Sequence, residues 1–125
     1  MRRILARLFK APRATSTEKP EKTYPVGLVG ESNYQRAISR CSVGQEVFLV
    51  REPDNEFDPK AIVCLNHRRE TIGYISRDSF VQGVVHDQGL GCSAKIKGLR
   101  KSGDKGFVGV VIDLEITDEA LPIVD

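Results

Sequence analysis

The stretch QEVFLVREPDNEFDPKAIVCLN, residues 45–66, decides the fold. Its two ends, 45–51 and 61–66, are apolar and rich in β-branched residues, which is typical of buried strands. The run between them is made largely of Pro, Asp and Asn, residue types that turns prefer. The stretch therefore predicts two strands joined by a polar connection.

Further strands lie on both sides of this stretch. TIGYIS at 71–76 follows the polar cluster HRRE and predicts a hairpin with 61–66. YPVGLVG at 24–30 predicts an earlier strand. Residues 94–98 predict a strand with a basic outer face, and 107–116 alternate apolar and other residues as a half-buried strand does. Six strands with short connections predict a mostly β fold, a small curled antiparallel sheet or barrel.

Two accessory helices are expected between these strands. Ser32 and Gln35 fit a capping box, and an apolar face runs from Tyr34 to Cys41. A second helix is expected from Arg77 to Gln88, capped by Ser76 and stopped by Gly89.

Charge divides the chain into three parts. The 125 residues suit one domain, with 19 basic and 17 acidic residues in all. Residues 1–23 hold seven Lys or Arg and two Glu, and 113–125 hold five acids and no base. We expect a flexible basic arm and linker at 1–23, a barrel domain at 24–117 and an acidic tail at 118–125.

The cysteines indicate a reducing compartment. Cys41, Cys64 and Cys92 are odd in number and form no CxxC pair, which disfavours a disulfide framework. The sequence shows no apolar run long enough for a membrane span, and Arg7 and Lys10 interrupt the apolar N-terminal segment that a signal peptide would need. We expect an intracellular protein, cytoplasmic or, in a bacterium, nucleoid-associated.

No catalytic constellation is evident in the sequence. His67 and His86 are the two histidines, and neither has a nucleophile in a suitable context. Asp54, Glu56 and Asp58 suit either a turn or, as an alternative, the metal site of a nuclease. We expect the turn, and hence no enzyme activity, metal, cofactor or small-molecule substrate.

Phe107 is the one aromatic that suggests binding without any family comparison. The alternation of its strand places it on the polar side, near Lys95, Lys97 and other cations. An outward aromatic among cations has the composition of a platform for stacking nucleobases. The alternative is an apolar cap over the mouth of the barrel.

Three segments resemble the HIRAN domain. They are VGLVGESNYQ, VFLVREPDNEFDPKAIVC and ETIGYISRDSF, and the matching residues are Val29, Gly30, Tyr34, Leu49, Arg51, Glu52, Pro53, Asn55, Phe57, Asp58, Ala61, Ile62, Gly73, Tyr74, Ile75 and Arg77. The resemblance spans about residues 24–116. It implies a six-stranded OB-like (SH3-like) barrel with two helices that binds single-stranded DNA at its free 3′ end, without catalysis, in DNA repair, replication or mobile-element processes.

The resemblance also implies roles for individual residues. Phe57 would stack on the terminal base, and Asp58 would accept a hydrogen bond from the terminal hydroxyl. Their alternative roles are a core position for Phe57 and a turn for Asp58. Arg77, expected at the first position of the second helix, would face a phosphate. The remaining candidates for contact with the strand are Asn33, Tyr34, Arg51, Asn55, Tyr74, Lys97 and Phe107.

A second hypothesis keeps the fold and changes the partner. The charge asymmetry of the two termini would also suit an adaptor that docks a repair or replication protein without binding DNA. Weaker binding after replacement of Phe57 or Arg77, with Asn66→Ala as the neutral control, would favour DNA.

Overall fold

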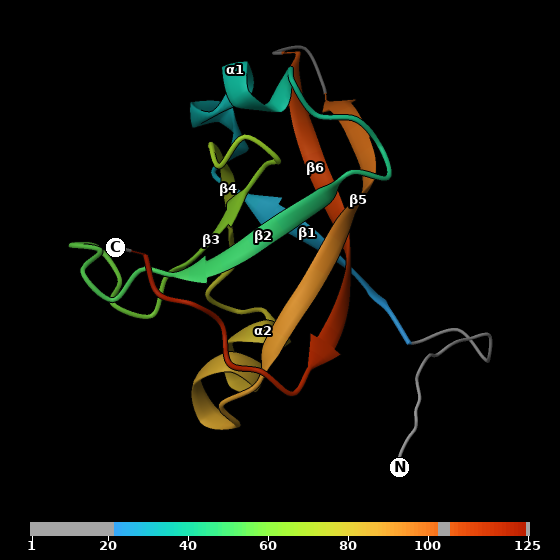
Figure 1. Ribbon diagram of the computed structural model, residues 1–125. Coiled ribbons are helices and arrows are strands. Elements are labelled where there is room, and N and C mark those ends of the chain that lie inside the picture. The colour runs from blue at the N-terminus through green and yellow to red at the C-terminus, as the bar shows by residue number, and fades with distance from the viewer. Residues whose placement is uncertain (1–21, 103–105, 125) are drawn as a thin grey trace.

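Six antiparallel strands close into a barrel in the computed structural model, which describes residues 22–102 and 106–124 (Figure 1). The strands pair in the order β1-β4-β3-β2-β5-β6. Their bounds are β1 Tyr24–Val29, β2 Glu46–Arg51, β3 Ile62–Leu65, β4 Thr71–Ile75, β5 Gly91–Ser102 and β6 Phe107–Thr117. The predicted fold class is confirmed. The predicted N-terminal arm lies outside the described residues, apart from its last two positions.

The helices are shorter than the sequence predicted. A 3-10 turn, η1 (Glu31–Asn33), precedes α1 (Gln35–Ile38). Later, α2 (Phe80–Gln82) continues into a π-helical turn, η2 (Gly83–Asp87). Figure 1 shows α1 and α2 at opposite ends of the barrel, with the connection from β2 to β3 projecting from its side.

The capping box predicted at Ser32 is wrong. Neither η1 nor α1 has a side-chain cap, and Gln35 instead contacts β6. Its Nε2 donates to the backbone oxygen of Val108 at 3.0 Å, and its Oε1 accepts from the Val108 amide at 2.8 Å. Glu31 accepts from the next inward amide, that of Val110, at 3.1 Å. The Gln35 side chain thus pairs with the backbone of β6 as a neighbouring strand would, beyond the point where β1 stops pairing with β6.

The core follows the alternation of the strands. Val110, Ile112 and Leu114 of β6 are almost completely buried, and Ile62 and Ile72 meet them from β3 and β4. Burying large aliphatic side chains from every strand is the main favourable term for a barrel of this size.

The segment after β6, set apart above for its acidic charge, packs against the barrel. Leu121 is 5% exposed and belongs to the core. The amide of Arg51 donates to the Pro122 oxygen at 2.9 Å, and the Val124 amide donates to the Arg51 oxygen at 2.9 Å. A Cβ at Gly91 would overlap the carbonyl of Glu119, so the close approach of this segment to β5 requires glycine. The segment therefore extends the end of β2 as a short parallel bridge.

Candidate nucleic-acid interface

The connection between β2 and β3 is held by its own polar groups. The Oδ1 atom of Asn55 accepts from the amides of Phe57 at 2.8 Å and Asp58 at 3.0 Å. The amide of Glu52 donates to the Ala61 oxygen at 2.9 Å, and that of Ala61 to the Asp58 oxygen at 3.0 Å. This is the turn structure that Asn and Asp favour, because their short side chains satisfy nearby backbone amides.

Phe57 stands out from this connection into solvent. Its side chain is 82% exposed, the highest value among the exposed large apolar residues. The core position considered for Phe57 is therefore wrong. Because the ring is exposed and the backbone that carries it is held by the turn, it is available to stack on a planar ligand.

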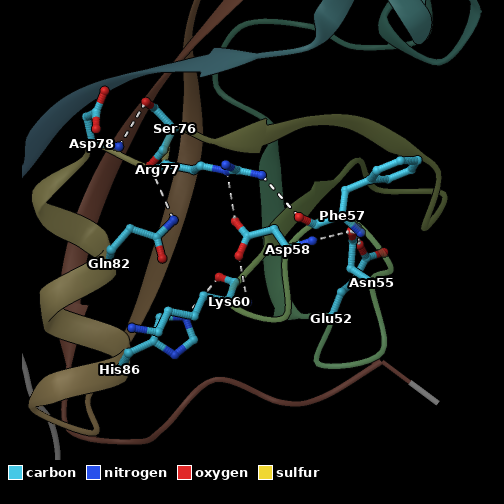
Figure 2. A network of polar contacts seen from close by, with 10 residues as sticks. All are labelled: Glu52, Asn55, Phe57, Asp58, Lys60, Ser76, Arg77, Asp78, Gln82 and His86. Atoms are coloured by element: carbon cyan, nitrogen blue, oxygen red, sulfur yellow. Dashed lines mark hydrogen bonds and ion pairs between the residues drawn. The ribbon is translucent and has the colours of Figure 1, made fainter.

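Arg77 joins this connection to the segment that leads into α2. Its Nη2 donates to the Phe57 oxygen at 3.1 Å, and its Nε lies 3.4 Å from Asp58 Oδ2 (Figure 2). The other carboxylate oxygen of Asp58 accepts from the Lys60 amide at 2.9 Å. The Arg77 side chain is 72% exposed while that of Asp58 is 23% exposed. Such a pair is weak in water, so the guanidinium can turn to another anion at small cost.

The expected helical position of Arg77 is wrong. Ser79, not Ser76, caps α2, because its side chain accepts from the Val81 amide. Ser76 instead accepts from the Asp78 amide at 3.2 Å in the preceding turn. Arg77 therefore lies before the helix, and an unfavourable helix dipole does not explain it.

Two cavities lie beside Phe57, and this residue lines both of them. The first, here the acidic cavity, measures about 400 Å³ and is lined by Glu52, Pro53, Asp54, Asn55, Glu56, Phe57, Tyr74 and Val124. The second, here the Arg77 cavity, measures about 280 Å³ and is lined by Phe57, Asp58, Lys60, Arg77 and Gln82. Among the described residues, those that line the acidic cavity include three carboxylates and no cation, while those that line the Arg77 cavity include two cations and one carboxylate. A phosphate is therefore favoured in the second cavity and repelled from the first.

Tyr74 lines the acidic cavity. Its hydroxyl donates to Glu52 Oε1 at 2.8 Å, and Asn55 Nδ2 donates to the same oxygen at 3.0 Å. Burial, with a smaller effect of the Glu52 carboxylate, raises the pKa of Tyr74 well above its ordinary value. Tyr34 lies 6.3 Å away between ring centroids and packs against the core.

Other predicted site residues lie apart from the two cavities. Asn33 ends η1 and is exposed. Lys97 lies at a register shift of β5, with its Nζ 3.7 Å from Asp113 Oδ1. Phe107 pairs with Ser102 at the tip of the last hairpin and is 40% exposed. Arg51 contacts the C-terminal segment through its backbone. The structure thus gathers Asn55, Phe57, Asp58, Tyr74 and Arg77 at the two cavities, while these four residues and Tyr34 do not line them.

Seven lining residues were not among the candidates for contact with the strand: Glu52, Pro53, Asp54, Glu56, Lys60, Gln82 and Val124. Glu52 and Lys60 belong to the same connection as Phe57 and Asp58, so the prediction of a turn there could have included them among the candidate site residues. Gln82 and Val124 reach the site from distant elements, and no sequence pattern marks them.

The alternative metal site receives no support from the geometry. Within residues 22–102 and 106–124, no group of three His, Cys, Asp or Glu side chains is placed to hold a metal ion. Asp54 and Glu56 are exposed, while Asp58 is engaged by Arg77. Over the same residues, the helices are too short or too polar to cross a lipid bilayer.

Comparison with known proteins finds one matching family and two similar solved structures. The sequence profile of the HIRAN domain matches residues 23–112. A protein from Lactobacillus plantarum has 24% identity and a TM-score of 0.52, over 75% of this chain and 99% of that chain. The HIRAN domain of human HLTF has 15% identity and a TM-score of 0.54, over 78% of this chain and 77% of that chain.

At these identities the two structures show likeness of fold alone, and no curated protein matches the chain in sequence. The family profile goes further, because it covers most of the chain and includes the whole connection from Glu52 to Ala61 together with Arg77 and Gln82. The chain therefore belongs to the HIRAN domain family.

Proposed function

We propose that this site binds the free 3′ end of single-stranded DNA. The observation that supports it is the placement of Phe57, 82% exposed, directly beside the Asp58–Arg77 pair. Membership of the HIRAN family supports nucleic acid as the ligand.

The charges of the Arg77 cavity favour a strand end over the middle of a strand. Every internal linkage carries a phosphate, which Asp58 would repel. A terminal 3′-hydroxyl instead donates a hydrogen bond to a carboxylate, and such a charge-assisted bond is stronger than a neutral one. Arg77 and Lys60 remain available for the phosphate on the 5′ side of the terminal nucleotide, and Phe57 for its base.

Fluorescence anisotropy with short labelled strands tests this proposal. We expect tight binding to a strand with a 3′-hydroxyl, and much weaker binding to the same strand with a 3′-phosphate, at low salt where phosphate contacts are strongest. Equal affinity for the two ends would contradict end recognition. Absence of binding to either strand would favour the protein-adaptor hypothesis instead.

The proposal includes recognition without catalysis. The chain would supply the binding step of a repair, replication or mobile-element process, together with a protein that acts on the strand. Incubation of labelled DNA with Mg²⁺ or Mn²⁺ is expected to leave it intact. Cleavage that disappears in Asp58→Asn would contradict this and revive the nuclease alternative.

A further inference from the structure

We infer that the side-chain oxygen of Gln82 accepts a hydrogen bond from a second hydroxyl of the terminal sugar. The site should therefore prefer a strand that ends in a ribonucleotide. The inference rests on the proposed function, because it places the terminal sugar in the Arg77 cavity. It adds the class of sugar that the site selects.

The side-chain amide of Gln82 has one partner and one unmet acceptor. Its Nε2 donates to the Ser76 oxygen at 3.2 Å, which fixes the orientation of the amide. Its Oε1 is buried and has no hydrogen-bond partner among the described residues. Buried acceptors in folded proteins are nearly always paired, so an unpaired one inside a binding site indicates a donor that arrives with the ligand.

Gln82, the residue that carries the unmet oxygen, lines the same cavity as Asp58. Gln82 and Asp58 both line the Arg77 cavity, whose volume is about 280 Å³. Figure 2 shows the Gln82 side chain extending from α2 toward the connection that carries Asp58 and Lys60. The two residues that carry these acceptors therefore border one space from opposite sides.

A deoxyribose end supplies a single hydroxyl donor, while a ribose end supplies two on adjacent carbons. The 2′-hydroxyl is the group by which proteins distinguish RNA from DNA. With the 3′-hydroxyl on Asp58, the 2′-hydroxyl becomes the donor that Gln82 Oε1 lacks. Since this oxygen is covered in the unbound protein, its pairing with a ligand hydroxyl requires the side chains of the cavity to rearrange when the strand binds.

Three DNA strands that differ only in the terminal sugar provide the test. Their last nucleotide carries 2′-deoxy, 2′-hydroxyl or 2′-fluoro, and fluorine reproduces the electronegativity of the hydroxyl without its proton. On the full chain we expect the ribonucleotide end to bind about 3- to 10-fold more tightly than the other two, the gain of one hydrogen bond. Equal affinity of all three, with binding still abolished by a 3′-phosphate, would overturn the inference and leave the proposed function intact.

Variants of the protein give the same test independently. Gln82→Met keeps the side-chain length without the acceptor, and it should bind the three ends with equal affinity. Gln88→Ala, an exposed glutamine at the end of the same helical segment, should retain the ribose preference. A ribose preference that survives Gln82→Met would overturn the assignment. Binding of no strand by the unmodified protein would reject the proposed function and this inference together.

Discussion

The guanidinium of Arg77 donates to the backbone oxygen of Phe57 at 3.1 Å while its Nε lies 3.4 Å from the Asp58 carboxylate. One side chain thus contacts both the residue proposed to stack on the base and the residue proposed to hold the hydroxyl. The geometry of the three is coupled, although they come from two separate connections of the barrel.

Phe57→Ala should weaken binding of single-stranded DNA by about 5- to 150-fold, the effect of losing one base–aromatic stack. The melting temperature should change little, because the side chain is exposed. Anisotropy and thermal unfolding measure the two effects. Phe57→Tyr should bind like the unmodified protein, and Val43→Ala, another exposed apolar position, is the matched control. Unchanged affinity in Phe57→Ala would show that the aromatic ring does not contact the bound strand.

Arg77→Ala should reduce affinity and also flatten its dependence on salt. Each phosphate contact that is lost lowers the slope of log affinity against log salt concentration by about 0.7 for a single strand. Titrations at several salt concentrations give the slope. Arg68→Ala removes an exposed cation from the turn between β3 and β4 that lines neither cavity, and it should leave the slope unchanged. An unchanged slope in Arg77→Ala would show that its guanidinium contacts no phosphate.

Asn55→Ala should damage binding through the shape of the turn. The variant leaves the Phe57 and Asp58 amides without their acceptor, and Glu52 without one donor. Asn55→Asp keeps the acceptor oxygens, although it loses the donated bond to Glu52. We expect the aspartate variant to retain more affinity than the alanine variant in the same anisotropy assay. The opposite order would mean that the donated bond, not the turn, positions Phe57.

Asn66→Ala, suggested by the sequence as a neutral control, should instead destabilise the protein. Asn66 is completely buried, donates to Ala37 and Glu70, and accepts from the Arg68 and Glu70 amides. Loss of these bonds should lower the free energy of unfolding by about 1–3 kcal/mol in chemical denaturation. A loss below the error of the measurement would contradict this role.

The effect of Asn66→Ala should also depend on pH. The hydrogen bond from Asn66 is the main cause that lowers the pKa of the Glu70 carboxyl. A lowered pKa in the folded state gives stability that is present above the unfolded pKa and lost as pH falls through the folded one. The difference between Asn66→Ala and the unmodified protein should therefore shrink below about pH 4. A stability difference that stays constant with pH would show that the charge of Glu70 does not contribute to the effect of the Asn66 hydrogen bond.

The native thiols should react slowly with iodoacetamide near pH 8. Burial raises the pKa of Cys92 to about 11 and also raises the pKa values of Cys41 and Cys64. Since the thiolate is the nucleophile, little of it is present at that pH. Mass spectrometry should show little alkylation until denaturant is added. Rapid modification of the folded protein would contradict the burial of these side chains.

The sequence was most informative where local pattern and final structure coincide. Alternation in residues 107–116 predicted the buried face of β6, and the turn residues after Arg51 predicted the connection that carries Phe57 and Asp58. Both depend on interactions between residues close in the chain, so periodicity and residue type were sufficient.

Contacts between distant segments could not be predicted in this way. Gln35 looked like a helix cap because its spacing from Ser32 is right, yet Val108 offers both a donor and an acceptor at the edge of β6. Phe107 was judged from its strand alone, and its distance from the cavities depends on how the barrel closes. Gln82 and Val124 enter the site only through tertiary structure.

The bridge between Arg51 and Ile123 also has a practical consequence. It carries Val124 to the rim of the acidic cavity, outside the span matched by the family profile. An environment-sensitive dye attached at Val124 would lie in the cavity that Phe57 also lines, and its emission should change when a base stacks on the Phe57 ring. The barrel could in this way be converted into an optical sensor of strand ends without altering any side chain that holds the ligand.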